Sequence, residues 1–104
     1  MSIFDYRQLD DIVHSRVRLA AMAYLATAGR ADFADLQREL AVTDGNLSAQ
    51  LRKLEDAGLV RVDREIRNRR AWTVVELTGT GRQALMDHVD RLARLIHAAR
   101  GGDT

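Results

Sequence analysis

The chain has 104 residues, of which 46% are hydrophobic and 30% are charged, and this composition predicts one globular domain and not a disordered segment. It contains no cysteine, which excludes a disulfide framework and a thiolate metal site and is typical of a reducing compartment. Its formal net charge of +1 excludes a uniformly basic protein, so any affinity for nucleic acid has to come from local charge.

Neither a membrane span nor an export signal is predicted. The longest uncharged apolar run, from Leu19 to Gly29, is too short to cross a bilayer. The chain begins Met-Ser-Ile-Phe-Asp, without a basic start or an apolar signal core. We therefore expect a cytoplasmic protein that makes no membrane contact.

Apolar residues near the start of the chain recur at helical spacing. Tyr6, Leu9 and Val13 share one helical face, which predicts a short helix within residues 3–13. The apolar side chains of this helix need a partner surface, either the same domain or a second subunit.

A second helix is expected from Ser15 to about Ala28. Ser15 is a favourable N-cap, and Gly29 lies just beyond the expected end. Residues 19–26 carry no charge on any side of this helix. A helix that is apolar all round is buried on most sides, so we expect it to be the central helix of the core.

Two short helices joined by a tight turn are predicted between residues 32 and 57. Asp32 and Thr43 are favourable N-caps for them, and Gly58 marks the end of the second helix. The first helix has an apolar face formed by Phe33, Leu36 and Leu40. Because only three or four residues join the two helices, the pair is typical of a helix-turn-helix motif.

The second of these helices has two unlike faces. Leu47, Leu51 and Leu54 form an apolar stripe at helical spacing. The opposite side carries small, amide and cationic residues, namely Gly45, Asn46, Ala49, Arg52 and Lys53. Small residues permit close approach, Asn can pair with an adenine edge, and Arg or Lys can reach guanine or phosphate. We interpret this helix as one that lies in a DNA major groove; the alternative is a solvated surface helix.

A β-hairpin is predicted after the helix-turn-helix. Residues 59–64 and 72–77 are rich in β-branched and aromatic side chains, which predicts two strands, with residues 65–71 as a basic loop between them. From Arg61 to Arg70 the chain has five Arg against two acidic residues, a local balance of +3, whereas residues 44–56 have a balance of −1. We therefore expect the hairpin, and not the helix before it, to supply electrostatic affinity for nucleic acid.

The last predicted helix carries a heptad pattern. Thr78 is a favourable N-cap for a helix over about residues 79–99. Leu85, Val89, Leu92 and Ile96 recur along it with spacings of four and three. We expect these four residues to form a homodimer interface; the alternative is that the helix packs on its own domain.

In addition to this pattern of elements, four stretches of the sequence resemble a known family. The stretches His14–Ala20, Ala31–Phe33, Leu40–Ser48 and Leu51–Gly58 closely resemble the compact winged-helix transcriptional regulators of bacteria and archaea that are allied to the MarR and ArsR families. The resemblance extends from about Leu9 to Leu95. It implies an α+β, mostly α fold for residues 1–104: a helix-turn-helix at about 32–57, a two-stranded wing at about 59–77 and a C-terminal dimerisation helix at about 79–99.

Two features depart from that family. Such proteins usually have Pro and Glu after a Leu-Thr pair that leads into the last helix, whereas this chain has Leu77-Thr78-Gly79-Thr80-Gly81. Because Pro and Glu favour the first turn of a helix, we expect the start of this helix to be looser or shifted. The wing of relatives is often Gly-rich, whereas the tip here is Arg67-Asn68-Arg69-Arg70.

The resemblance implies a homodimer that binds double-stranded DNA. One helix would lie in the major groove, and the wing would lie along the minor groove or the backbone. The candidate contacts on the helix are Thr43, Gly45, Asn46, Ser48, Ala49, Gln50, Arg52 and Lys53. The candidate contacts on the wing are Arg67, Asn68, Arg69 and Arg70, since Arg inserted into a narrow minor groove reads its shape.

Neither catalysis nor a cofactor is expected. The sequence has no Gly-rich phosphate loop, nucleophile elbow or carboxylate pair, and His14, His88 and His97 have no paired-ligand spacing, so we expect no metal site. Two alternatives to the DNA interpretation remain. One is a winged helix that contacts a regulatory protein. The other is a MarR-like repressor whose small-molecule effector lodges between the dimer helix and the core, in a pocket lined by Tyr6, Tyr24 and Trp72.

Overall fold

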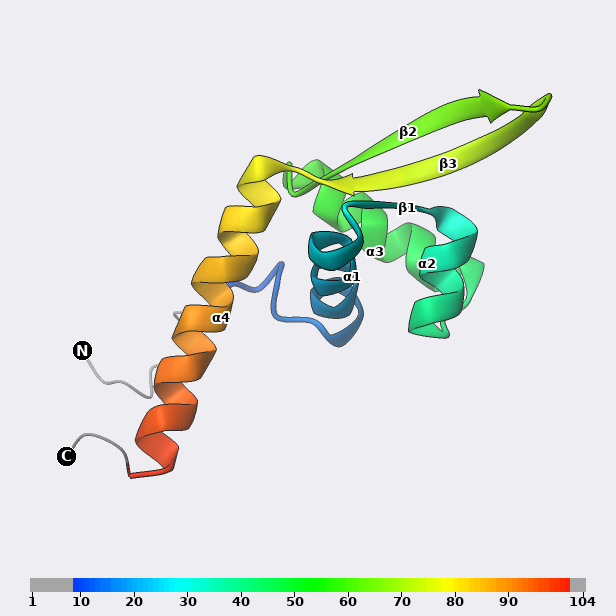
Figure 1. Cartoon of the computed structure of the whole chain (residues 1–104). Helices are drawn as coiled ribbons and strands as arrows, with labels where there is room; N and C mark the ends of the chain where they lie inside the picture. The colour runs from blue at the N-terminus through cyan, green and yellow to red at the C-terminus, as the bar shows by residue number, and fades with distance from the viewer. Residues whose placement is uncertain (1–8, 102–104) are drawn as a thin grey trace.

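A computed structural model describes residues 9–101, and within this range it contains four helices and three strands (Figure 1). The helices are α1 (Arg16–Ala28), α2 (Phe33–Leu40), α3 (Asp44–Asp56) and α4 (Gly79–Ala99). The strands are β1 (Arg30–Asp32), β2 (Val60–Arg67) and β3 (Arg70–Leu77). The first three helices form the body, while the β2–β3 hairpin and α4 project from it in different directions.

The segment before α1 is a turn, so the prediction of a helix there was wrong for the residues that the structure describes. The Asp10 carboxylate accepts hydrogen bonds from the backbone amides of Ile12 and Val13, at 2.8 and 3.2 Å. A side chain that captures these amides competes with helical hydrogen bonding. The turn buries Val13 completely in the core. Tyr6 of the predicted helix lies outside the described residues.

The helix α1 lies at the centre of the body and contacts α2, α3, α4, β1 and β3. Its predicted bounds are confirmed, and Gly29 after its end has a φ of +85°. The predicted burial on most sides is confirmed, since only Ala20 and Ala23 of residues 19–26 are exposed. Ala21, Met22 and Leu25 are buried in the core, and Leu19, Tyr24 and Ala26 pack against it while partly buried.

The predicted helix-turn-helix is confirmed as α2 and α3. The Asp32 carboxylate accepts a hydrogen bond from the Asp35 amide at 2.9 Å, and the Thr43 hydroxyl accepts one from the Asn46 amide at 3.2 Å. After α3, Gly58 adopts a φ of +75°, a conformation that favours glycine. The leucines that fix the pair to the core are Leu36, Leu47, Leu51 and Leu54.

The three strands form an antiparallel sheet in the order β1-β3-β2. The strand β1 was not predicted; it has three residues and pairs with β3, with Arg30 opposite Glu76. The hairpin is longer than predicted, since β2 and β3 pair all the way to Arg67 opposite Arg70. Only Asn68 and Arg69 form the turn, at φ values of 51° and 65°. Two central residues at positive φ are typical of a type I′ turn, so the expected loop over residues 65–71 was wrong.

The helix α4 starts where the sequence predicted. The Thr78 hydroxyl accepts a hydrogen bond from the Gly81 amide at 2.9 Å. A Cβ atom added at Gly81 would lie 2.0 Å from the backbone oxygen of Leu59. The two glycines after Thr78 therefore do not loosen or shift the helix, because Gly81 permits close packing against the start of the hairpin.

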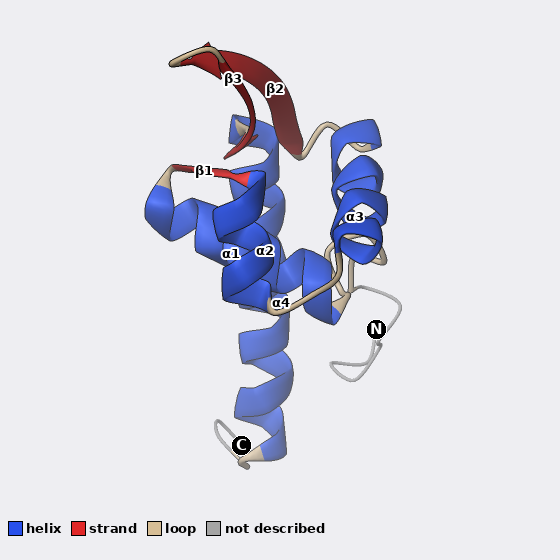
Figure 2. Ribbon diagram, turned by 90° about the vertical axis from the view of Figure 1, so that its right-hand side faces the viewer, coloured by secondary structure: helices blue, strands red, loops and turns tan. Residues whose placement is uncertain are grey.

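The projecting α4 and hairpin make the molecule elongated (Figures 1 and 2). The principal extents are 60 × 24 × 21 Å, and the radius of gyration is 15.9 Å. A compact domain of this length would have a radius of gyration of about 13 Å. Within residues 9–101, none of the helices combines the length and the apolar character that a membrane span requires.

Candidate nucleic-acid interface

The helix α3 presents an exposed polar face on a buried base. Leu47, Leu51 and Leu54 on its inner side are at most 4% exposed. Figure 2 shows α3 at the edge of the body, with the hairpin rising from its C-terminal end. The outer side exposes Gly45, Asn46, Ser48, Ala49, Arg52 and Lys53. The structure therefore brings these predicted residues together on one surface, while Thr43 caps the helix and Gln50 is half-buried.

A groove of about 570 Å³ separates the outer part of α3 from the hairpin. Its polar lining comes from Asp44, Ser48, Arg52 and Glu55 of α3 and from Arg64 and Thr73 of the hairpin. Arg64 and Thr73 lie directly opposite each other in the β2–β3 register. Two acidic residues balance the charge of the two arginines, so the groove has no net positive charge. It nevertheless has one guanidinium group on each wall.

Arg64 is a candidate contact that the sequence prediction missed. Side chains alternate between the two faces of a strand, so Arg64 shares a face with Val60 and Val62, which turn toward the helices. The sequence signal that would have identified Arg64 is this alternation, since Arg64 is the last residue of the predicted strand over residues 59–64.

The other face of the hairpin is a network of exposed ion pairs. Glu65 pairs with Arg67 at 2.7 Å and also with Arg30. The hydrogen bond from Arg67, followed by the one from Arg30, lowers the pKa of Glu65. On the same face, Arg61 pairs with Asp63 at 3.2 Å and with Glu76 at 2.5 Å. Exposed pairs contribute little to stability, but they occupy these guanidinium groups and reduce the free positive charge of the hairpin.

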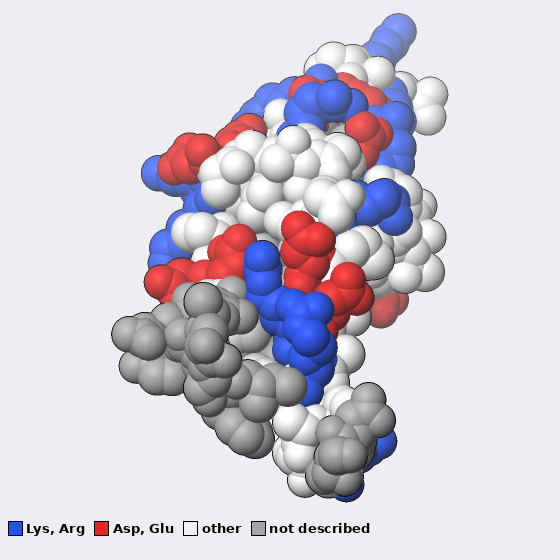
Figure 3. Space-filling view, turned by 90° about the vertical axis from the view of Figure 1, so that its left-hand side faces the viewer, with Lys and Arg blue, Asp and Glu red and all other residues white. Residues whose placement is uncertain are grey.

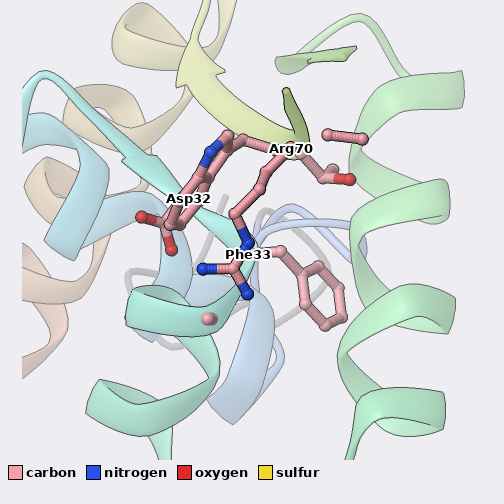
Figure 4. A pocket seen from close by; sticks show the side chains of 7 residues that line it. Asp32, Phe33 and Arg70 are labelled. Atoms are coloured by element: carbon pink, nitrogen blue, oxygen red, sulfur yellow. The ribbon is translucent and has the colours of Figure 1, made fainter. Parts of the chain in front are cut away.

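Arg70 folds back from β3 onto the body. Its guanidinium carbon lies 5.9 Å from the centroid of the Trp72 ring. Figure 4 shows the Arg70 side chain reaching toward the start of α2, beside Asp32 and Phe33. These four residues line a pocket of about 280 Å³. The pocket that includes Trp72 therefore lies between the start of α2 and the half of β3 nearest the turn, and not between α4 and the core, where it was predicted.

The four predicted wing residues are thus not equivalent. Arg67 is paired with Glu65, and Arg70, although it follows the turn directly, extends its side chain toward the start of α2. Asn68 and Arg69 alone form the tip. Among the described residues, Arg64 and Arg69 have no ion-pair partner, so they are the most available cations of the hairpin.

Comparison with known proteins identifies the family. The model of the family described as "winged helix DNA-binding domain" matches residues 17–96. The chain belongs to this family. An uncharacterized protein of Methanocaldococcus jannaschii is 32% identical to it over 84 residues, which are 81% of this chain and 91% of that protein.

Solved structures of other proteins share the fold of this chain. The transcriptional regulator homologue from Pyrococcus horikoshii OT3 superimposes with a TM-score of 0.88 at 31% identity, covering 95% of this chain and 98% of that one. MarR superimposes with a TM-score of 0.76 at 20% identity, covering 93% of this chain and 70% of MarR, which shows a shared fold. The predicted resemblance is confirmed, and the protein is a DNA-binding transcriptional regulator with a β2–β3 wing.

The helix α4 of this winged helix has an apolar side that its own domain leaves open. Met86, Val89 and Ile96 are 43%, 45% and 52% exposed. Leu92 is half-buried, whereas Leu85 is only 3% exposed and belongs to the core of its own domain. Leu85 is therefore not part of the open side. Figure 3 views the molecule from the side of α4 and shows Lys and Arg interspersed with Asp and Glu over the described part of that face.

A contact between two histidines joins α4 to the turn before α1. His88 is completely buried, and its Nε2 lies 3.1 Å from Nδ1 of His14. Within the described residues, His88 Nδ1 has no hydrogen-bond partner. Burial, followed by the neighbouring His14, lowers the pKa of His88 and favours its neutral form. The sequence analysis missed this contact because the two residues are 74 positions apart. In residues 9–101, no group of three or more His, Cys, Asp or Glu is arranged to hold a metal ion.

Proposed function

We propose that this winged helix regulates transcription as a homodimer that binds specific sequences of double-stranded DNA, with α3 in the major groove and the wing along the minor groove or the backbone. The observation that carries this proposal is the exposed polar face of α3, which stands on buried leucines beside a groove with arginine on both walls. A DNA major groove is wide enough to admit an α-helix, and donors on that helix can reach the base edges.

The chemistry of α3 suits close approach to bases. Gly45 and Ala49 leave room for the backbone, and Asn46 and Lys53 offer hydrogen-bond donors at either side of them. No Cβ contact lies within 4 Å of Gly45, so its side of the helix is open. The N-terminal amides of α3 also favour a phosphate group.

The groove between α3 and the wing suits the sugar–phosphate backbone that separates a major from a minor groove. Arg52 and Arg64 face it from α3 and β2, and Ser48 and Thr73 add hydroxyl groups. Contacts of this kind position a protein on DNA without reading its sequence. Arg69 at the wing tip would extend the cationic track beyond the groove.

Substituting one cation on each face of β2 tests the proposal. Arg64 faces the groove, while Arg61 lies on the opposite face and is paired with Asp63 and Glu76. We expect Arg64→Ala to weaken binding to all sequences several-fold and to reduce the salt slope of the affinity by about 1. Arg61→Ala removes the same charge from the same strand, and we expect a much smaller loss. Fluorescence anisotropy titrations against sequences selected from a random DNA pool measure both effects.

Two results would oppose the proposal. Equal losses for Arg61→Ala and Arg64→Ala would mean that only net charge matters and that the groove does not contact DNA. No binding at low salt would favour the alternative, a winged helix that contacts another protein.

Binding of a small-molecule effector is a second candidate function, favoured by the pocket between the wing and the start of α2. Arg70 supplies a cation and Trp72 and Phe33 supply aromatic surface, so an aromatic acid is the chemical class that fits. The pocket has a volume of about 280 Å³, which is at the small end for a ligand site. An effector there would engage Arg70 and would change DNA affinity without changing the dimer.

A further inference from the structure

A hydrogen-bonded chain runs from α1 to the outer face of α3. Arg18 of α1 donates from Nη1 to the Oε1 atom of Gln50 at 2.5 Å. Gln50 in turn donates from Nε2 to the Oδ1 atom of Asn46 at 3.0 Å. Arg18 is itself fixed, because its Nε donates to the backbone oxygen of Ile12 at 2.6 Å and its Nη2 to that of Asp11 at 3.3 Å. The chain therefore begins in the turn before α1 and ends on an exposed α3 residue.

The chemistry of Arg18 gives this chain a direction. A guanidinium can donate hydrogen bonds but cannot accept them, so Gln50 has to turn its oxygen toward Arg18. The Gln50 amide nitrogen then faces Asn46, and since a nitrogen with two hydrogens only donates, Asn46 has to turn its own oxygen inward. Asn46 Nδ2 is left as the free group, and it makes no hydrogen bond within the described residues.

We infer that Arg18 is a positioning residue that sets which hydrogen-bonding group Asn46 offers to DNA. The inference rests on the proposed function, since it requires α3 to lie in the major groove. Through Gln50, Arg18 makes Asn46 a hydrogen-bond donor. Guanine, adenine and thymine each present an acceptor in the major groove, whereas cytosine presents only its N4 donor. The base pair read by Asn46 should therefore place guanine, adenine or thymine, and not cytosine, opposite Nδ2.

This inference changes the roles expected for two predicted contacts. Gln50 has both ends of its amide engaged inside the domain, so it relays orientation and does not itself reach a base. Asn46 has its oxygen directed along the helix to Gln50. It would thus read a base with one donor and not with the paired donor and acceptor that recognise adenine.

Base preferences selected from a random DNA pool test the inference at a single position of the site. The position that Asn46 reads is the one whose preference disappears in Asn46→Ala. For the wild-type protein, we expect cytosine to be disfavoured there by about fivefold or more. In Arg18→Met, the Gln50 and Asn46 amides are free to rotate, and we expect the preference at that position to become flat while the other positions keep theirs. Arg18→Lys retains a donor and should restore part of the preference.

A second variant reverses the direction of the chain without removing Arg18. In Gln50→Glu, both carboxylate oxygens accept, so Asn46 has to donate from Nδ2 inward and present Oδ1 outward. We expect the preference at the same position to shift toward cytosine or adenine, which present donors. The added negative charge should also lower the affinity for every DNA sequence. Such a uniform loss would not change the base preference at one position.

The matched control is Arg16→Met, which removes the same charge two residues away. Arg16 is exposed and takes no part in the hydrogen-bonded chain from Arg18 to Asn46. Its loss should leave the selected sequence unchanged. Thermal unfolding checks that each variant folds, and if Arg18→Met does not fold, Gln50→Glu decides alone.

The outcomes separate this inference from the function on which it rests. If the wild-type protein selects no sequence, the proposed function fails and the inference fails with it. If the wild-type protein selects a sequence but Arg18→Met and Gln50→Glu select the same base at the Asn46 position, the proposed function stands and the inference is wrong. A change in Arg16→Met equal to that in Arg18→Met would also overturn it, because charge alone would then account for the effect.

Discussion

Gly81 lies where the first turn of α4 meets the start of the wing. Its amide donates to the Thr78 hydroxyl, and its α-carbon lies so close to Leu59 that a Cβ atom would stand 2.0 Å from the Leu59 oxygen. The backbone oxygen of Leu59 also accepts a hydrogen bond from the Thr78 amide at 3.1 Å. The joint between wing and helix therefore depends on the absence of a side chain at this position.

We predict that Gly81→Ala lowers the free energy of unfolding by about 3 kcal/mol, since the backbone has to move to admit the methyl group. Gly79→Ala is the matched control, because nothing lies within 4 Å of its added Cβ. Alanine favours a helix over glycine by up to about 1 kcal/mol, so Gly79→Ala should be neutral or stabilising. Urea unfolding followed by circular dichroism measures both, and equal effects would contradict this account of Gly81.

His88 makes stability depend on pH at the contact between α4 and the turn before α1. The groups that face it are His14 and Asp10 from the turn and Arg91 from its own helix. Burial, followed by the charge of His14, lowers the pKa of His88, and Asp10 opposes this shift in part. The folded protein therefore takes up a proton on His88 less readily than the unfolded chain does.

We predict that the wild-type protein loses stability as the pH falls below about 6.5, where the unfolded chain gains the proton that the fold resists. The loss levels off once the pH is below the lowered pKa of folded His88. His88→Leu removes this proton uptake, so its melting temperature should fall less between about pH 7.5 and 5.5. The same pH dependence in His88→Leu would assign the loss to other groups.

At the scale of elements, the wing turn combines backbone strain with an exposed cation. Asn68 and Arg69 both adopt positive φ, at 51° and 65°, and the second position of a type I′ turn favours glycine. Arginine at this conformation costs on the order of 1 kcal/mol. The residue nevertheless places a cation at the farthest point of the wing.

We predict that Arg69→Gly raises the free energy of unfolding by about 1 kcal/mol and at the same time weakens DNA binding. Arg69→Lys keeps both the charge and the strain, so it should change neither quantity much. Chemical unfolding and anisotropy titrations on the same samples separate the two effects. A stabilised Arg69→Gly that binds DNA as tightly as wild type would show that the tip does not contact DNA.

The elements that the sequence predicted well are those specified by local signals. The caps Asp32, Thr43 and Thr78 and the leucine spacing of α3 define the helices from neighbouring residues alone. The errors come from long-range or competing contacts. β1 has only three residues, and it is a strand because its backbone pairs with β3, which lies far along the chain. The N-terminal helix was replaced by a turn because Asp10 captures two amides.

In the candidate interface too, the features set by local signals were predicted and those set by long-range contacts were not. The outer face of α3 follows from helical periodicity and was predicted residue by residue. The inward orientation of Gln50 could not be predicted, because it depends on Arg18, 32 positions earlier in the chain. The separation of the wing arginines into paired and free groups depends on Glu76, which the strand register places opposite Arg61, and on Glu65, which pairs with Arg67 two residues along the same strand.

At the scale of the whole molecule, the length of α4 bears on how DNA is bound. The helix has 21 residues, and its far half extends beyond the body of the domain (Figure 1). An apolar side on a projecting helix gains from being covered by a second copy. A symmetric pair would present two α3 helices to one duplex, and half-sites for such pairs are spaced by about one turn of DNA, or roughly 34 Å. Dimerisation would then raise the affinity by making the second half-site contact intramolecular.

We predict that replacing both Val89 and Ile96 with Glu converts a dimer to a monomer. These residues are 45% and 52% exposed in the single chain, so the change should spare the fold while placing two charges in the interface. Arg94→Glu is the control, because it alters the net charge by the same amount at an exposed position about 120° around the helix from the middle of the open side. Multi-angle light scattering measures the mass, and DNA titrations on one and two half-sites measure the consequence. The double variant should lose the advantage of the second half-site, whereas Arg94→Glu should retain it; a wild-type monomer at high concentration would contradict the dimer.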